Sequence, residues 1–368
     1  MRILHIYKDY HPVFGGIENH LKWLAEAQAA RGHEVTVLVT NPEGLKTTVQ
    51  EENGVQVIRV ARIATVASTP ISLSLPLLLR RQQPDVVHLH FPYPWGEISQ
   101  WFLRRGQATV MTYHSDVVRQ AGFLHLYGPV LRRILRQMDR ILPTSQPYIQ
   151  SSPWLRSVAS KCTVVPLGID VDRFSKPRPN MVQTIRQRYP GPILLFVGRL
   201  RYYKGLPYLL RAMQQVQATL LVVGTGPESQ NLERLNSELG ITDKVQFLGD
   251  VSNETLPAYY QAADIFVLPS SQRSEAFGIV LLEAMAAGTP LISTELGTGT
   301  SWVNQDGVTG LVVPPRDENA LASAINKLLG DNELRLKMGQ NAQKRARQEF
   351  DLPVLVDRVM AVYEDVLR

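Results

Sequence analysis

Short apolar segments alternate with helical patterns along almost the whole chain. The first series of expected strands comprises residues 2–7, 33–40, 55–60, 85–90, 109–116, 140–145 and 161–170. The second series comprises residues 193–200, 219–228, 245–251, 263–271 and 289–294. Because strands that are joined through helices pair in parallel, this alternation predicts an α/β protein with doubly wound parallel sheets. Ligands of such sheets bind at the carboxyl ends of the strands.

The length of 368 residues predicts two domains, because one hydrophobic core seldom holds so many residues. The segment DRFSKPRPNMVQ (172–183) is rich in proline and charge, as linkers are. We therefore expect domains at 1–180 and 181–351, with their two sheets facing one another across a cleft. The final helical segment, 352–368, is expected to pack back onto the first domain.

The composition is that of a soluble globular protein, with 44% hydrophobic and 20% charged residues. The single cysteine, Cys162, excludes an internal disulfide framework and a cysteine-cluster metal site, which favours a reducing cytoplasm. The first residues read as a strand, so we expect no signal peptide. No apolar run approaches the roughly 18–20 residues that span a bilayer.

The net charge of +6 is concentrated in the first half of the chain. Residues 1–180 contain 21 Lys and Arg against 13 Asp and Glu, whereas the remainder contains 18 against 20. A basic domain should meet something anionic. The sequence contains no zinc-finger spacing, RNP-like strand or helix-turn-helix, so we expect no nucleic-acid partner. An anionic membrane surface or a lipid-linked substrate fits better.

The segment FLHLYGPVLRRILRQMDR (123–140) has apolar residues at helical spacing and arginines between them. The apolar positions are Tyr127, Val130, Leu131, Ile134, Leu135 and Met138, and the basic ones are Arg132, Arg133, Arg136 and Arg140. This pattern is typical of a helix that lies on a membrane surface. The alternative is that the apolar stripe belongs to the core and the arginines are solvated.

Two carboxylates, Glu275 and Glu283, lie eight positions apart in SEAFGIVLLEAMAAGTP (274–290). If a helix begins near Gly278, its first turn presents unpaired N–H groups and the positive end of the helix dipole, which attract phosphate. Glu275 would then flank the phosphate, and Glu283 would lie inside the helix within reach of a sugar hydroxyl. The alternative is a helix that packs on a sheet while both glutamates are solvated.

Other candidate site residues follow predicted strands. Arg199 and Lys204 follow the first strand of the second domain, where two cations can clamp a diphosphate unless this is merely a solvated turn. His114 ends a strand of the first domain, at the edge where chemistry is expected, and at least one of His88 and His90 should face the interior. Gly16, in the Gly-Gly pair before the first helix, allows a close backbone approach to a ligand, although a tight turn alone could explain it.

Taken together, these segments resemble the retaining glycosyltransferases of family 4, which have the GT-B fold. The resemblance covers essentially the whole chain. It rests on the Gly-Gly pair, YHSD, PLGID, VGRLRYYKG, GTGPE, FLGDV and, above all, E-AFGIVLL-E. It implies two Rossmann-like domains, of which the second holds a nucleotide-sugar donor and the first binds the acceptor.

The resemblance also implies a role for each matching residue. Glu283 would contact the donor ribose, and Arg199 and Lys204 would bind the diphosphate. The transferred hexose would be held by Glu275 and the backbone of Ala276, Phe277 and Gly278, with Ile279 completing the donor site. Gly16 would approach the phosphate, His114 would lie near the reacting carbon, and the loop around Val251 would hold the base. Where relatives often have Gly-Gly-x-x-Glu after TPLIST, this chain has GTGTSWVN.

We therefore expect a metal-independent hexosyltransferase that acts with retention of configuration and has His114, Arg199, Lys204 and Glu275 as its catalytic group. No cofactor is expected beyond the nucleotide-sugar, which is GDP-mannose or a UDP-hexose. The expected acceptor is a glycan or a polyprenyl-diphosphate-linked glycan of envelope polysaccharide or lipopolysaccharide synthesis, reached from the cytoplasm or the inner face of the membrane. The alternatives are a nucleotide-sugar 2-epimerase of similar fold and a non-catalytic nucleotide-sugar-binding regulator.

Overall fold

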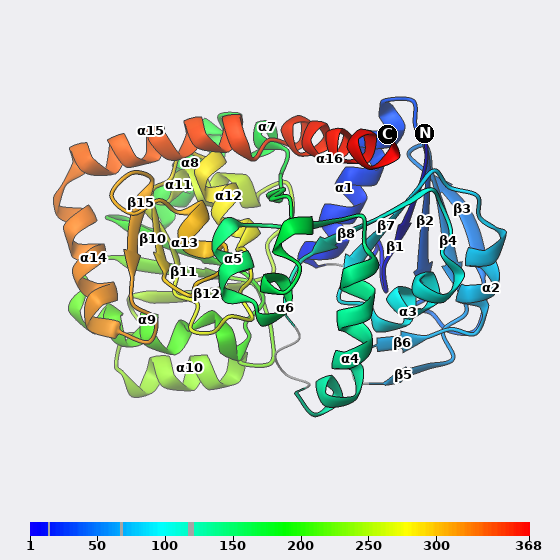
Figure 1. Ribbon diagram of the computed structural model, residues 1–368. Coiled ribbons are helices and arrows are strands. Elements are labelled where there is room, and N and C mark those ends of the chain that lie inside the picture. The colour runs from blue at the N-terminus through cyan, green and yellow to red at the C-terminus, as the bar shows by residue number, and fades with distance from the viewer. Residues whose placement is uncertain (14, 67–68, 117–120) are drawn as a thin grey trace. The chain divides into compact units, whose positions relative to one another are not determined.

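The computed structural model describes residues 1–13, 15–66, 69–116 and 121–368 (Figure 1). The chain forms two compact units, one of residues 1–167 with 352–368 and the other of residues 168–351. Each unit is an α/β fold built on its own largely parallel sheet, as the alternating pattern predicts. Among the described residues, no helix combines the length and the apolar character that crossing a membrane requires.

The first unit is built on a seven-stranded sheet. Its strands in spatial order are β3 (Thr48–Glu52), β4 (Val55–Val60), β2 (Glu34–Thr40), β1 (Arg2–Ile6), β7 (Val86–Phe91), β8 (Ala108–Tyr113) and β9 (Arg140–Pro143). All neighbours are parallel except β3 and β4. A separate antiparallel pair joins β5 (Ala64–Val66) and β6 (Thr69–Ile71).

Helices cover both faces of this sheet. They are α1 (Gly16–Ala30), α2 (Ser74–Arg81), α3 (Pro94–Leu103), α4 (Ala121–Gln137), α5 (Gln146–Ser151), α6 (Pro153–Arg156) and α16 (Leu352–Leu367). The last helix packs against α1 and β8, although it lies more than 200 residues further along the chain (Figure 1). The face beneath α1 and α16 therefore receives side chains from both ends of the sequence.

The second unit is built on a fully parallel six-stranded sheet. Its strands in spatial order are β12 (Val245–Gly249), β11 (Thr219–Val223), β10 (Ile193–Val197), β13 (Ile265–Leu268), β14 (Leu291–Thr294) and β15 (Gly310–Val313). Strands β10 and β13 are buried at every position, which is the usual condition of central strands in a doubly wound sheet.

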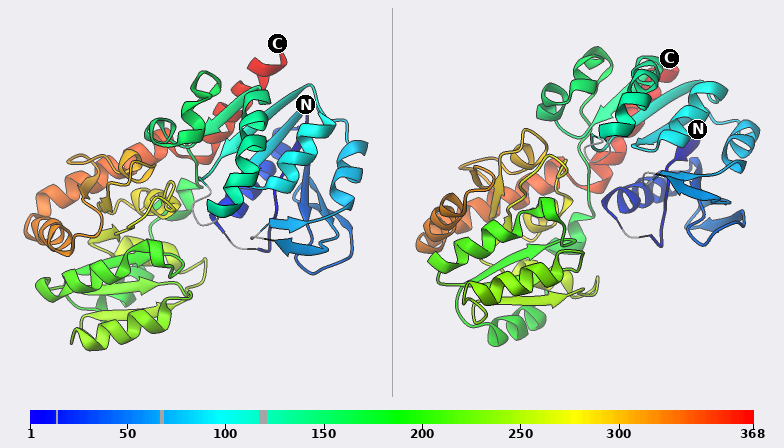
Figure 2. Two further views of the ribbon diagram at one scale, coloured as in Figure 1. Left: turned by 60° about the horizontal axis from the view of Figure 1, so that its bottom comes forward. Right: turned by 90° about the horizontal axis from the view of Figure 1, so that it is seen from below.

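Nine α-helices of the second unit flank its sheet (Figure 2). They are α7 (Val171–Ser175), α8 (Pro179–Arg188), α9 (Leu206–Ala212), α10 (Ser229–Glu238), α11 (Leu256–Ala262), α12 (Ile279–Ala286), α13 (Thr300–Val303), α14 (Glu318–Gly330) and α15 (Asn332–Glu349). The second unit begins at residue 168 rather than near 180 because α7 packs on α11, α12 and α15. The Pro-rich segment thus lies inside this unit.

One expected strand, 161–170, is wrong. Only isolated bridges form there, between Ile141 and Cys162 and between Ile169 and Asp351. Val165 is buried in the core there, but the segment forms no continuous ladder. The short strands β3, β5, β6 and β15 were not expected: β3 and β5 are largely exposed and carry no apolar run, and β6 and β15 are only three and four residues long.

The basic helix α4 does not offer an apolar face to a membrane. Its stripe of Leu131, Ile134, Leu135 and Met138 is buried in the first unit. The intervening arginines, Arg132, Arg133 and Arg136, are exposed. The alternative, in which the apolar stripe belongs to the core and the arginines are solvated, is therefore confirmed. Any contact of α4 with an anionic surface would have to be made by the exposed arginines.

Candidate functional site

The site residues of the second unit lie where its strand order reverses. Strand β10 is flanked by β11 on one side and by β13 on the other, so the chain winds in opposite directions from this point. Lys204 follows β10 and Glu275 follows β13. Crevices at such reversals are the usual ligand sites of parallel sheets.

Lys204 and Glu275 form a buried ion pair. The Nζ atom of Lys204 lies 2.6 Å from Oε2 of Glu275, and each side chain is 10% exposed. The Ser270 hydroxyl donates to the same oxygen at 3.1 Å. Burial opposes the charge of Lys204, but the Glu275 carboxylate raises the pKa of the lysine above its ordinary value. Lys204 is thus protonated at neutral pH, and its burial rules out the alternative of a solvated turn for this residue.

A glycine makes this pair possible. Gly205 has φ +72°, a conformation that residues with a side chain rarely adopt. A Cβ atom at Gly205 would overlap the backbone carbonyl of Pro269 at the end of β13. The short 3₁₀ turn of Tyr202–Lys204 can therefore press against the strand that leads to Glu275.

Glu283 lies inside α12, as expected, and is half-buried. Its Oε2 atom accepts a hydrogen bond of 2.6 Å from the hydroxyl of Tyr260 on α11. Burial raises the pKa of Glu283, while the Tyr260 hydrogen bond and the positive charges of Arg173 and Lys204 oppose this rise. Lys204 therefore acts electrostatically on both glutamates. Nothing in the sequence marked Tyr260 as the partner of Glu283.

Helix α12 begins as expected, with Gly278 as its N-cap at φ +80°. The backbone N–H groups of Gly278, Ile279 and Val280 have no hydrogen-bond acceptor among the residues that the structure describes. These groups and the helix dipole are what an anion requires. The buried ring of Phe277 packs edge-on against Phe350 and fixes the turn before the helix.

The loop that departs from the family pattern braces this segment. The Thr298 hydroxyl donates to the carbonyl of Glu275 at 2.8 Å, and the Gly299 N–H donates to the carbonyl of Ala276 at 2.7 Å. A Cβ atom at Gly299 would meet Phe277 at 2.6 Å. Thr298 and Gly299 thus position the backbone of 275–277, a function that the sequence did not reveal.

Arg199 and Val251 lie at the same carboxyl edge of the second sheet. Arg199 follows Gly198 at the end of β10, is exposed, and has no ion-pair partner within the described part of the chain. Val251 is half-buried in the loop after β12, where Thr225 hydrogen-bonds Asp250 at 3.2 Å. Arg199 is therefore available to an anionic ligand, whereas Lys204 is already paired.

In the first unit, Gly16 begins α1 and is exposed. A Cβ atom at the preceding Gly15 would overlap the carboxylate of Glu18, which folds back over the start of the helix. Burial raises the pKa of Glu18. A phosphate that approaches Gly16 would therefore meet this carboxylate, so the helix end is less free than the sequence suggests.

His114 follows β8 and is 4% exposed. Its Nε2 atom lies 3.1 Å from Nδ1 of His90, and its own Nδ1 is buried with no hydrogen-bond partner in the part of the chain that the structure describes. Burial lowers the pKa of His114, so the ring is neutral at physiological pH. His88 and His90 are both buried, in agreement with the expectation of at least one interior histidine. The nearby Asp116 accepts hydrogen bonds from Tyr113 and Ser152, which ties the YHSD segment to the fold.

Within the described residues, two groups of three histidines have nitrogens close enough to share a metal ion. They are His5, His88 and His90, and His20, His90 and His114. No carboxylate belongs to either group, and both nitrogens of His90 are engaged with neighbouring rings. The single Asp-x-Asp tripeptide, 170–172, is engaged elsewhere, because Asp170 caps α7 and Asp172 pairs with Arg347.

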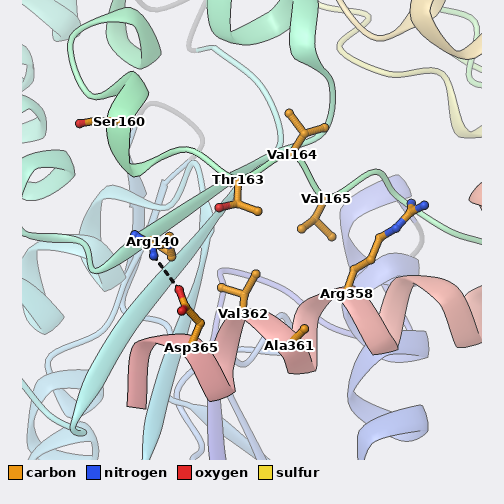
Figure 3. A pocket seen from close by; sticks show the side chains of 9 residues that line it. All are labelled: Arg140, Ser160, Thr163, Val164, Val165, Arg358, Ala361, Val362 and Asp365. Atoms are coloured by element: carbon orange, nitrogen blue, oxygen red, sulfur yellow. Dashed lines mark hydrogen bonds and ion pairs between the residues drawn. The ribbon is translucent and has the colours of Figure 1, made fainter. Parts of the chain in front are cut away.

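A surface hollow of about 550 Å³ lies elsewhere in the first unit (Figure 3). It is bordered by β9, the segment 160–165 and α16. Two of its polar lining residues hydrogen-bond each other, since Arg140 donates to Asp365 at 2.6 Å. None of the predicted site residues lines this hollow.

Two family models match the chain. The model described as Glycosyl transferases group 1 matches residues 179–345, and the model described as Glycosyltransferase Family 4 matches residues 14–173. The two matches correspond closely to the two sheets.

Similar proteins cover almost the whole chain. The O-antigen chain mannosyltransferase C of Escherichia coli is 35% identical over 100% of this chain and 99% of its own length. The D-rhamnosyltransferase WbpZ of Pseudomonas aeruginosa is 39% identical over 95% of this chain and 92% of its own length. Among solved structures, a sucrose-phosphate synthase from Thermosynechococcus elongatus has a TM-score of 0.82 at 27% identity, covering 99% of this chain and 98% of that one.

Proposed function

Because this chain belongs to the group 1 and family 4 glycosyltransferases and has their GT-B fold, we propose that it transfers a hexose from a nucleotide-sugar with retention of configuration. The product would be an α-linked glycan of the bacterial envelope, such as lipopolysaccharide. The observation that carries the proposal is the group of Lys204, Glu275 and the unpaired N–H groups of α12 at one edge of the second sheet.

The donor would bind along this edge. Arg199, Lys204 and the N-terminus of α12 would hold the diphosphate, because each supplies positive charge or free donors there. Glu283 would accept from the ribose hydroxyls through the oxygen that Tyr260 does not use. The backbone of Ala276–Ile279 would hold the hexose beside Glu275, and the loop at Val251 would hold the base.

In the first unit, His114 would contact the hexose and Gly16 would approach the diphosphate. The Gly16 contact requires the carboxylate of Glu18 to move away from Gly15 or to be protonated, because two anions would otherwise share one helix end.

The chemistry would not require a protein base. The bond between the anomeric carbon and the diphosphate oxygen breaks, and negative charge develops on the leaving phosphate. Lys204, Arg199 and the α12 dipole would stabilise that charge. The acceptor oxygen bonds to the same face of the sugar and gives its proton to the departing phosphate oxygen, which accounts for retention. These cations would also replace the divalent metal on which other transferases rely.

A mannose-type donor is supported by the names of the two similar proteins, a mannosyltransferase and a D-rhamnosyltransferase. We therefore place GDP-mannose or a GDP-linked relative ahead of the UDP-hexoses. The acceptor would be a glycan on a polyprenyl diphosphate, which the positive charge of the first unit attracts. The enzyme would then act in the cytoplasm, at the inner face of the membrane.

The proposal is tested in two steps. Thermal-shift measurements with GDP-mannose, UDP-glucose and ADP-glucose identify the donor, because the correct one stabilises the folded protein. Turnover of that donor is then followed without metal, with and without a lipid-linked glycan acceptor, and the anomeric configuration of the product is determined by NMR. A β-linked product, an absolute requirement for a divalent ion, or epimerisation of donor alone would contradict it.

A further inference from the structure

Five of the eight histidines of the chain are buried together in the first unit. His5 lies on β1, His88 and His90 on β7, His114 follows β8, and His20 lies on α1. The register pairs His5 with His88, and His90 with Thr112, so these side chains share the face that α1 and α16 cover. Central parallel strands normally carry aliphatic residues on such a face, so a row of imidazoles there requires an explanation.

Three of these rings form a continuous hydrogen-bonded chain. Nε2 of His114 lies 3.1 Å from Nδ1 of His90, and Nε2 of His90 lies 3.1 Å from Nδ1 of His5. Nε2 of His5 lies 2.7 Å from the amide oxygen of Gln28 on α1. A neutral imidazole carries one N–H donor and one acceptor nitrogen, so all three rings must have the same tautomer. The residue that hydrogen-bonds the last ring, His5, decides which tautomer all three rings adopt.

That residue is Gln28, and a contact on the other side of its amide group fixes the orientation of this group. Its amide nitrogen donates to the thioether sulfur of Met360 at 3.6 Å. A thioether can only accept, so the amide nitrogen belongs on that side and the oxygen faces His5. His5 must then donate through Nε2, which makes its Nδ1 an acceptor for the next ring.

The other end of this hydrogen-bonded series of rings is His114. The Nδ1 atom of His114 is buried and has no hydrogen-bond partner among the described residues, and His20 lies edge-on to this ring, with 5.2 Å between the ring centroids and no hydrogen bond. Burial lowers the pKa of all five histidines, to about 4 for His5, and neither of the two histidine groups found among the described residues includes a carboxylate that could hold a proton. The rings are therefore neutral at pH 7.

We propose that Gln28, acting through His5 and His90, locks His114 as its Nε2–H tautomer, so that Nδ1 accepts a hydrogen bond from a hydroxyl of the sugar substrate. Gln28, His5 and His90 are positioning residues in this scheme. The identification of the ligand as a sugar rests on the proposed function; the tautomer lock does not. An uncharged acceptor also suits glycosyl transfer, because an imidazolium would oppose the positive charge that develops on the sugar ring.

The test reads the tautomers directly in the full-length protein labelled with ¹⁵N-histidine. Two-bond ¹H–¹⁵N spectra distinguish Nε2–H from Nδ1–H rings, and we expect His5, His90 and His114 all to be Nε2–H. Gln28→Leu removes the acceptor, so the His114 signal should become a mixture of tautomers. Gln28→Glu keeps an acceptor oxygen and should restore the single Nε2–H form.

Leu24→Ala is the matched control, because Leu24 is fully buried one turn earlier on α1 and makes no contact by hydrogen bond with the rings. It should destabilise the fold and leave the tautomers unchanged. An Nδ1–H ring at His114 in the wild type, or an unchanged tautomer in Gln28→Leu, would overturn the lock.

Binding is measured separately, by adding the nucleotide-sugar that the thermal-shift screen identifies. The Nδ1 resonance of His114 should then shift, and Gln28→Leu should lower kcat/KM by roughly threefold to tenfold, the usual effect of one hydrogen bond. A bound donor or acceptor that leaves this resonance in place would refute the sugar contact, whereas failure of every nucleotide-sugar to bind would count against the proposed function alone.

Discussion

Replacing Lys204 by Met should separate the role of this cation in folding from its role in ligand binding. The Lys204–Glu275 pair is 2.6 Å long and each side chain is 10% exposed, so the variant leaves a buried carboxylate with only the Ser270 hydroxyl beside it. Breaking such a pair costs about 3–5 kcal/mol of folding free energy. For a unit of this size the melting temperature should fall by roughly 6–20 °C.

Combining Lys204→Met with Glu275→Gln should restore most of that stability, because no charge then remains buried without a partner. The affinity for the nucleoside diphosphate, measured by titration calorimetry, should not return. It should stay roughly 10- to 100-fold weaker than in the wild type, since a charge-assisted hydrogen bond to phosphate is lost. Glu275→Gln alone is the control, and it should bind the diphosphate at least as tightly as the wild type.

The two roles give opposite results in the double variant. If the double variant melts like the wild type and also binds the diphosphate like the wild type, Lys204 serves only to neutralise Glu275. The assignment of Lys204 to the leaving phosphate would then be refuted, together with the part of the mechanism that depends on it.

Four further changes have defined outcomes. Arg199→Ala should lower kcat by about 10²-fold or more without a change in melting temperature, because this exposed cation has no partner in the described structure; wild-type turnover would contradict its role at the diphosphate. Tyr260→Phe should raise the KM for the nucleotide-sugar, because Glu283 loses the Tyr260 hydrogen bond that keeps its pKa from rising further. An unchanged KM would contradict the assignment of Glu283 to the ribose. Denaturation curves should show that the free energy of unfolding decreases as the pH drops from 6.5 toward 4, because His5 and His20 are protonated in the unfolded chain but stay neutral when they are buried. His5 alone should account for a loss of about 3 kcal/mol by pH 4. A free energy of unfolding that does not change over this range would show that the rings become charged without unfolding. A variant in which the exposed arginines of α4 (Arg132, Arg133 and Arg136) are replaced by Glu should bind vesicles of anionic lipids more weakly than the wild type does. Equal binding would show that these arginines do not contact the membrane.

The sequence alone determined the architecture and the edge of each sheet on which chemistry is expected. Short apolar runs such as ILLFV are typical of strands that are buried on both faces, and the helices between them indicate doubly wound connections. The start of α12 was also predictable, because Gly278 adopts a conformation that suits glycine, and a helix began where the pattern placed it. Features that depend on local backbone conformation or on hydrophobic burial could therefore be predicted from the sequence.

Contacts between distant segments were decided only by the tertiary structure. Glu283 could not be matched to Tyr260, nor Gln28 to Met360 more than 300 residues away, because hydrogen bonds between side chains carry no local sequence signal. The apolar stripe of α4 looked the same whether it faced a membrane or the core, since periodicity records a buried face but not what covers it. Packing on the sheet supplied that answer, and it also aligned the histidines into a chain whose direction Gln28 sets.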